Sequence, residues 1–353
     1  MRPLHAGTLA LCAIAGATAV ASAQPRPPRP LREVIRLGPV VLALGKEEED
    51  GPELFGNVIS VALDGAGRIY VLDNSDATIR IFDSRGRSVE VTGKRGSGPG
   101  DMQNPFALLH DQRATLLLAD NVLGVTRFRT DSTGVTISRT LARDLRPSAV
   151  CLLNDTLIAA GPQDDGIVHV IGADGNTLRS IGTTFAAESI PVLQKMAKRM
   201  AAFRMVCDAR RSNAIVIELV GPGIRAYRMD GTVVWSLRLP GYDGSWFARD
   251  GRSGSPTVIL GKDATAFAAQ LSDDRMLVQV VRTRTTPGDR STGRRGRREE
   301  DHRTTYIVDL ATGVIVAEGS DLPAIQAIAG DRIVTGSSDP FPHIQVRTLT
   351  LLP

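Results

Sequence analysis

One short turn recurs along most of the chain and constrains the fold more than any other feature. Its clearest copy, Asp-Ser-Arg-Gly at residues 83–86, separates two short runs that are rich in β-branched residues. An Asp followed closely by a Gly is typical of the tight turn of a β-hairpin. Further copies lie at residues 131–134, 174–175, 230–231 and 309–313, at successive intervals of 48, 43, 56 and 79 residues. The sequence therefore predicts a series of similar antiparallel β units.

The best-defined unit, residues 57–91, contains four predicted strands, at residues 58–63, 68–72, 77–82 and 88–91. A four-stranded propeller blade takes about 40 to 45 residues, so the two longest intervals each require an insertion. A sixth unit at residues 324–349 stops after its third strand. Pairing the β-rich stretch 34–44 as the missing strand would close the ring and leave no open edge. We predict an all-β, six-bladed β-propeller over residues 32–353, closed by this N-terminal strand.

A resemblance to a known class rests on residues 67–73, Gly-Arg-Ile-Tyr-Val-Leu-Asp, and 79–83, Ile-Arg-Ile-Phe-Asp, with Gly86 in the turn and a Gly-rich link at 93–102. With these residues the chain resembles the NHL-repeat class of six-bladed propellers, especially its exported bacterial members. The resemblance is sharp over about residues 55–110 and rests on spacing alone further along. It implies the fold and export, and it implies no particular activity, because propellers host many unrelated functions.

The first residues have the pattern of an export signal. Arg2 precedes an apolar run at residues 9–20, and Ala-Ser-Ala follows at residues 21–23. The run is shorter than the roughly 20 residues that span a bilayer. We expect a signal peptide over residues 1–23 that is cut after Ala23, a Pro-rich spacer over 24–31, no transmembrane span, and a secreted or periplasmic protein.

Two cysteines follow the expected signal peptide, Cys151 and Cys207. Each comes after a Val in the first strand of a predicted blade, and the two blades are neighbours. Export permits a disulfide between them. The alternative is a pair of buried thiols that act as small apolar side chains, and the sequence leaves both open.

The unusual segments of the chain fall on one predicted face. In a propeller, the loops between the second and third strands lie on the same face as the links between blades. The segments on this face are the Gly-rich link 93–104, the segments 186–204 and 240–256, and the Arg-rich insertion 282–303. Function usually resides in loops that a rigid scaffold holds, so we expect the functional site on this loop-rich face.

Residues 186–204 predict one inserted helix. Pro191 suits a first-turn position, and the apolar residues 192, 193, 196, 200 and 203 recur at helical spacing. Lys195 and Arg199 fall mainly on the other side. This basic side is either a solvated surface, with the apolar side packed on the propeller rim, or a surface that contacts a partner or a membrane.

The insertion 282–303 holds eight Arg and four acidic residues, an excess that equals the net charge of +4 of the whole chain. The basic charge is therefore local. Its densest part contains Arg294, Arg295, Arg297 and Arg298. The insertion is either a disordered hairpin extension or a contact with an acidic partner, an unknown protein or an envelope component. No aromatic residues interleave the arginines to stack bases, so we expect no nucleic-acid partner.

Two pairs of polar residues occupy matching positions at the ends of predicted second strands, Asp73-Asn74 and Asp120-Asn121. They either bind a ligand on the loop-rich face or cap turns. Calcium ligands such as Asp64 and Asp111 would lie in tight turns on the opposite face, where Asp is favoured for turn chemistry. The histidines remaining after cleavage do not converge at their predicted positions, so we expect no metal and no cofactor.

Three functions remain open, and a binding role is favoured among them. The first is a monomeric binding or protein-interaction module that uses the loop-rich face. The second is a metal-dependent lyase or hydrolase with its site at the mouth of the channel. The third is a purely structural repeat. The lack of a convergent catalytic set favours the first, and whether the chain is an enzyme stays open.

Overall fold

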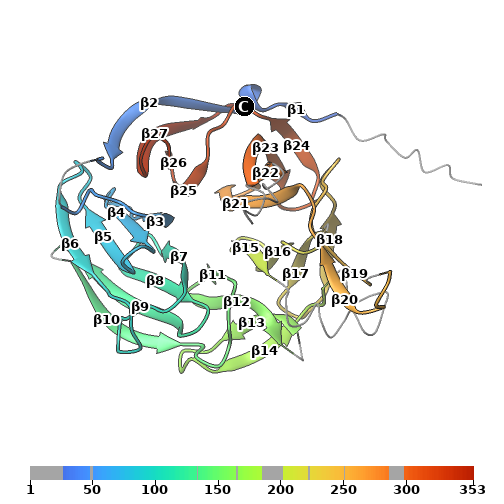
Figure 1. The fold of residues 1–353 in the computed structure, drawn as a ribbon, viewed down its shortest axis with the longest axis horizontal. Helices are drawn as coiled ribbons and strands as arrows, with labels where there is room; N and C mark the ends of the chain where they lie inside the picture. Colours follow the sequence, from blue (N-terminus) through green and yellow to red (C-terminus); the bar gives the residue numbers. More distant parts are fainter. Residues whose placement is uncertain are drawn as a thin grey trace, which may run out of the picture.

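The structure is a computed structural model that describes residues 27–47, 51–132, 134–163, 166–184, 202–221, 223–249, 251–285 and 298–353. Six antiparallel sheets stand around a common centre, each with its first strand innermost (Figure 1). The prediction of an all-β, six-bladed propeller is confirmed. Among the described residues, the only helical element is the short 3-10 helix η1 (Leu31–Glu33). None of the described helices is long and apolar enough to cross a membrane.

The first three blades follow one another along the chain. Blade one consists of β3 (Val58–Leu63), β4 (Ile69–Asp73), β5 (Thr78–Phe82) and β6 (Ser88–Thr92). Blade two consists of β7 (Pro105–His110), β8 (Thr115–Asp120), β9 (Gly124–Asp131) and β10 (Gly134–Leu141). Blade three consists of β11 (Ala149–Leu153), β12 (Thr156–Gln163), β13 (Gly166–Ile171) and β14 (Thr177–Ile181).

The other three blades complete the ring. Blade four consists of β15 (Phe203–Asp208), β16 (Asn213–Glu218), β17 (Ile224–Arg228) and β18 (Val233–Leu237). Blade five consists of β21 (Asp263–Ser272), β22 (Arg275–Thr285), β23 (Arg298–Asp309) and β24 (Ile315–Gly319), and β1 (Arg29–Pro30) pairs in parallel with β24. Blade six consists of β25 (Ile325–Ala329), β26 (Arg332–Ser337), β27 (His343–Leu351) and β2 (Ile35–Leu44).

The core lies between the blades, as six apolar clusters that each join two neighbours. Strand β16 shows how one sequence serves two clusters. Ala214 and Val216 pack toward blade three, while Ile215 and Ile217 pack toward blade five. Successive side chains of a strand point to opposite faces of the sheet. When the second strand of a blade is covered on both faces, its sequence is therefore a continuous apolar run.

The recurrent turns join the third and fourth strands of their blades. In blade one, the Oδ1 atom of Asp83 accepts hydrogen bonds from the backbone N–H groups of Arg85 and Arg87, both at 2.9 Å. Gly86 has a φ of 82°, which glycine adopts without steric cost. The side chain of Asp83 thus replaces backbone partners that a tight turn cannot supply.

The ring is closed by the N-terminal strand, as predicted. Strand β2 pairs antiparallel with β27, from Ile35 opposite Leu351 to Leu44 opposite Ile344. In Figure 1 the blue β2 runs along the outer side of the red β27. Leu44 is 3% exposed and belongs to the cluster between blades six and one. The two ends of the propeller are therefore joined by a complete sheet.

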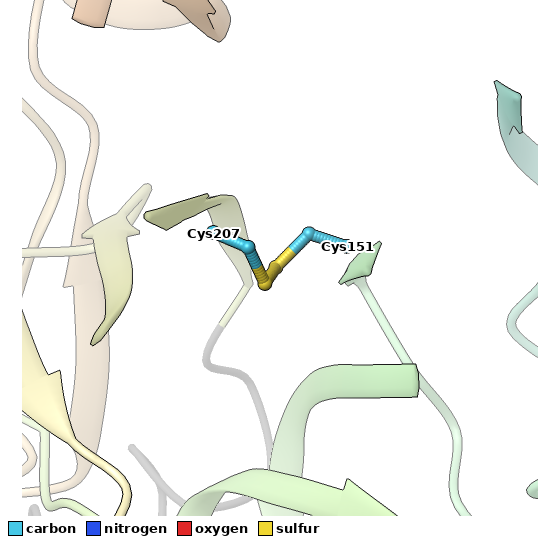
Figure 2. Close-up of a disulfide and its surroundings, with 2 residues drawn as sticks. All are labelled: Cys151 and Cys207. Carbon is cyan, nitrogen blue, oxygen red and sulfur yellow. A yellow bond between two sulfur atoms is a disulfide. The ribbon is translucent and has the colours of Figure 1, made fainter. Parts of the chain in front are cut away.

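A disulfide joins two neighbouring blades near the centre of the ring. Cys151 on β11 and Cys207 on β15 are both buried, with a Cα–Cα distance of 5.7 Å. Figure 2 shows the two side chains meeting from separate strands. The cross-link therefore ties blade three to blade four at their innermost strands.

The segment predicted as a helix, 186–204, lies outside the described residues up to position 201. Its C-terminal boundary was wrong, because Phe203 and Arg204 begin strand β15. Phe203 is 1% exposed and alternates with Met205 and Cys207 on the side that faces blade three. An apolar residue at helical spacing can equally belong to the period-2 pattern of a following strand, and here tertiary packing selects the strand.

Two further segments extend into strands. The link 240–256 enters a hairpin of β19 (Trp246–Arg249) and β20 (Pro256–Ile259). The insertion 282–303 was expected to be a loop, but its two ends continue the blade as strand, with Arg282 opposite His302. Residues 286–297 lie outside the described part of the chain.

Candidate functional site: a cleft on the loop-rich face

A cleft of about 680 Å³ lies over one end of blade six. Its lining comes from three blades. Blade six contributes residues 336–338 and 342–344 and Gln326, the link into blade six contributes 322–324, blade five contributes Arg303, and blade one contributes 56–58. Most of these residues belong to links between blades or to the end of β26 and the start of β27, and Val58, Arg303 and Gln326 come from strands β3, β23 and β25. The cleft therefore lies on the face where the sequence places the functional loops.

The wall from blade five is organised by Gln279, a fully buried residue in the middle of β22. Its Nε2 group donates to Thr305 Oγ1 at 3.1 Å and to the carbonyl oxygen of Pro323 at 2.9 Å. Its Oε1 atom accepts from Arg303 Nη1 at 3.2 Å and from the backbone N–H of Ile325 at 3.1 Å. One amide thus fixes the link into blade six, the start of β25 and the guanidinium that lines the cleft.

The wall from blade six is the loop between β26 and β27. Ser337 Oγ donates to the carbonyl oxygen of Asp339 at 3.1 Å and accepts from its N–H at the same distance. His343 Nδ1 lies 2.9 Å from the carbonyl oxygen of Phe341, which can only accept a hydrogen bond. Nδ1 is therefore the donor of this hydrogen bond. Serine hydroxyls and an imidazole are thus held at this side of the cleft.

The wall from blade one is held in place by Asp73, which is fully buried at the end of β4. Its two oxygens accept from the backbone N–H groups of Gly56 at 2.8 Å and Asn57 at 2.9 Å. Burial raises the pKa of Asp73, but hydrogen bonds from Ser75 and from these backbone groups outweigh it and leave the pKa below its ordinary value. Asp73 therefore anchors the residues that line the cleft.

Asp120 makes the equivalent arrangement in blade two. One oxygen accepts from the N–H groups of Gln103 at 2.7 Å and Asn104 at 2.8 Å, and the other accepts from the turn that follows β8. Asn121 Oδ1 accepts from Asn104 Nδ2 at 2.6 Å. The backbone N–H of Asn74 bonds the carbonyl of Asn57 in blade one. These are the contacts of turn capping, the second of the two interpretations of the Asp-Asn pairs.

The predicted basic residues are only partly accounted for. Lys195, Arg199, Arg294, Arg295 and Arg297 lie outside the described residues. Arg298 is the first residue of β23, and only its backbone is described. Arg303, at the end of the same insertion, is the cation that the structure places in the cleft.

The carboxylates considered as calcium ligands cap turns on the opposite face. Asp64 Oδ1 accepts from the N–H groups of Ala66 at 2.9 Å and Arg68 at 2.8 Å. Asp111 Oδ1 accepts from three successive N–H groups, those of residues 113 to 115. Such multiple acceptance satisfies the carboxylate within its own turn.

The buried histidines also have structural partners. The side chain of His110 has no exposed surface, and its ring stacks on Tyr70 with centroids 5.4 Å apart. Burial lowers the pKa of His110. His169 is fully buried and bonds Ser180 Oγ and the carbonyl of Gly161, both at 2.9 Å. Across the described part of the chain, no three His, Cys, Asp or Glu residues are grouped in a way that could hold a metal ion.

Sequence reasoning missed Gln279 and the way it orients Arg303. A signal was present, because Gln279 interrupts the apolar run Met-Leu-Val-Gln-Val-Val at residues 276–281. A polar residue within such a run must be hydrogen-bonded when the strand is buried. Its partners could not be read from the sequence, because they lie in another strand and in the next blade.

Comparisons with known proteins show the fold and no family. No family model and no curated protein matches the chain. Among solved structures, it is similar to a putative exported protein of Bacteroides fragilis at 11% identity, with a TM-score of 0.51 over 90% of this chain and 95% of that one. It is also similar to a member of the DUF4221 family from Bacteroides vulgatus at 8% identity, with a TM-score of 0.53 over 90% and 99%. Virginiamycin B lyase of Staphylococcus aureus matches at 12% identity with a TM-score of 0.48, over 90% and 99%.

Proposed function

We propose that this chain is an exported binding propeller that takes its ligand in the cleft on its loop-rich face. The observation that carries the proposal is the cleft of about 680 Å³ between blades five, six and one. Small-molecule sites in proteins occupy about 300 to 1,000 Å³, and they combine apolar walls with a few placed polar groups. Val58, Pro323 and Pro342 supply apolar surface here, with Arg303 and His343 among the polar groups.

The way the cleft is built supports a binding role. Two of its walls are held by Gln279 and Asp73, which are both fully buried and belong to different blades. Because these walls are already fixed, the protein loses less conformational entropy when a ligand binds. A cleft of this kind is suited to recognition by a preformed surface.

Export is supported by three independent features. The pattern of residues 1–23 is that of a cleavable signal peptide. A disulfide such as Cys151–Cys207 persists in oxidising compartments. One of the similar structures is named as a putative exported protein. We propose a monomer that is secreted or periplasmic. The Pro-rich segment predicted as a spacer over 24–31 ends earlier than expected, because Arg29 and Pro30 pair with β24 and Leu31 is buried against blade five.

The basic residues that the sequence predicts on the same face belong to the proposal as a second contact. Arg294, Arg295, Arg297 and Arg298, together with Lys195 and Arg199, would meet an acidic protein or envelope component that reaches beyond the cleft. Such a contact adds electrostatic attraction, and its strength falls as ionic strength rises.

Ligand-observed NMR with a library of small polar fragments tests the proposal. Ala324 is a half-buried residue of the cleft lining, and Ala324→Trp fills part of the space. The matched control is Ala66→Trp, in an exposed turn on the opposite face. We expect fragments that bind the wild type and the control and lose binding to Ala324→Trp. Equal binding to all three proteins would contradict a role for the cleft.

A further inference from the structure

We propose that the ring holds a second site at its centre, where Arg204 binds the carboxylate of a small organic acid. Arg204 belongs to blade four and is not part of the cleft lining. The inference therefore goes beyond the proposed function and does not depend on it.

Arg204 is the one exposed side chain of an inner strand that is otherwise buried. It is the second residue of β15, and the other five residues of this strand are buried. Phe203 and Met205 pack toward blade three, so Arg204 points to the opposite face of the sheet, where Val206 packs toward blade five. β15 is the innermost strand of blade four (Figure 1). The side chain of Arg204 therefore starts from the wall around the centre of the ring, at its loop-rich end.

The surroundings of Arg204 have the character of a recess. The side chain contacts solvent, yet burial lowers the pKa of its guanidinium. A convex surface would expose the group without this desolvation, so the side chain lies in solvent that protein largely encloses. Arginine nevertheless stays protonated in proteins. This end of the ring therefore holds a full positive charge that water stabilises less than it does at an open surface.

The charge of Arg204 has no partner among the residues that the structure describes. No hydrogen bond or ion pair joins its guanidinium to any of them, and burial is the sole cause of its pKa shift. The other formally charged residues of the six inner strands are paired. Asp208 accepts from Arg211 Nη1 at 3.1 Å, and Asp263 accepts from Arg282 Nε at 2.8 Å. A desolvated charge without a partner is costly, and a bound anion would supply the partner.

The equivalent positions of the other inner strands offer an apolar environment. The second residues of these strands are Ile59, Phe106, Val150, Ala264 and Gln326. Ile59 and Phe106 are half-buried and Ala264 is exposed, so part of this apolar surface remains accessible. None of the five carries a charge. A ligand at this level of the ring therefore meets one cation, apolar surface and no like charge from these positions.

This environment favours a carboxylate over a phosphate. A planar guanidinium matches the two oxygens of a carboxylate, and one cation balances its single charge. A phosphate group carries a charge of about −1.5 to −2 at neutral pH, which one arginine leaves partly unbalanced. The apolar side chains around Arg204 suit the hydrocarbon part of an organic acid.

Ligand-observed NMR titrations with butyrate, butyramide and inorganic phosphate test the inference. Butyramide has the same hydrocarbon chain as butyrate and lacks the charge. We expect the wild type to bind butyrate about tenfold more tightly than butyramide, because only the acid forms a charge-assisted pair with Arg204. Equal binding of the acid and the amide, or tighter binding of phosphate than of butyrate, would overturn the inference.

Three variants assign the effect to the proposed group. Arg204→Met removes the charge, keeps an unbranched stem and should abolish the preference for the acid over the amide. Arg204→Lys keeps the charge without the planar fork and should retain only part of the preference. Arg228→Met makes the same change at the exposed end of β17 in the same blade and should behave as the wild type. An undiminished preference in folded Arg204→Met would overturn the inference.

Thermal unfolding of the ligand-free proteins gives a second readout. Arg204→Met should not lower Tm, because it removes a desolvated charge that has no partner. A Tm clearly below that of the wild type would contradict the unpaired charge on which the inference rests.

The second site and the cleft can be tested apart from each other. Loss of the butyrate preference in Arg204→Met supports the second site whether or not any fragment distinguishes Ala324→Trp from the wild type. If the preference survives in Arg204→Met and is lost in Ala324→Trp, the acid binds in the cleft. This inference would then be wrong, and the proposed function would stand.

Discussion

The disulfide between Cys151 and Cys207 should contribute measurably to stability, because it closes a long loop. The two cysteines are 56 residues apart in the sequence. In the chain-entropy description, cross-linking a loop of this length stabilises the folded state by about 4 kcal/mol. Unfolding entropy is about 2.1 cal/mol/K per residue, so for a propeller of about 320 residues this corresponds to about 6 °C in Tm.

Two perturbations separate the cross-link from the packing of the sulfur atoms. Cys151→Ala with Cys207→Ala removes both, at sites that are 6% and 7% exposed. Reduction of the wild-type protein under mild denaturant breaks the bond and keeps the sulfur atoms. Urea unfolding and thermal unfolding should show both forms destabilised by similar amounts, with a slightly larger loss in the double variant.

The result that would refute this reasoning is specific. Mass spectrometry after alkylation would first establish that both thiols of the reduced protein are free. If the free energies of unfolding of the reduced and oxidised forms then differ by less than about 1 kcal/mol, the disulfide does not stabilise the fold through loop entropy. The unfolded chain would then already hold the two inner strands close together.

Three further predictions concern closure, capping and pH. Leu44→Ala should lower the free energy of unfolding, measured by urea titration, by about 3 kcal/mol, because it leaves a cavity between the closing strand and blade one. Val41→Ala, at a position on the same strand that is 56% exposed, should change this free energy little. Asp73→Asn should cost about 2 kcal/mol, because an amide nitrogen then faces backbone N–H donors, and thermal unfolding with unchanged Tm would contradict this. Burial raises the pKa of Asp263, but hydrogen bonds led by that from Arg282 outweigh it and leave the pKa below its ordinary value. The contribution of Asp263 is therefore present above the unfolded pKa of about 3.9 and is lost as pH falls through the lower folded pKa. Arg282→Met removes this contribution, so its Tm should lie below that of the wild type at neutral pH, and the two curves should converge as pH falls below about 4. Parallel curves of Tm against pH would show that the pair has no such role.

The number of blades and the closure of the ring were determined by local features of the sequence. In a turn such as that at Asp83, the side chain satisfies backbone N–H groups only a few residues away. The turns and the intervals between them can therefore be recognised in the sequence without knowledge of the fold. Closure by β2 followed from a similar constraint, because a blade with three strands leaves an edge that must be paired. Both signals depend on neighbours in sequence or on hydrogen-bond requirements that every strand shares.

The cleft and the cross-link were decided by the tertiary structure. Gln279 meets Arg303 and Pro323 only because blades five and six stand side by side at a particular distance. Cys151 and Cys207 could equally have been separate thiols until the inner strands of blades three and four came together. Phe203 joined a strand because packing against blade three favoured it over the helical pattern that precedes it. Side-chain contacts between blades depend on distances that no local pattern encodes, so the site emerged only from the assembled ring.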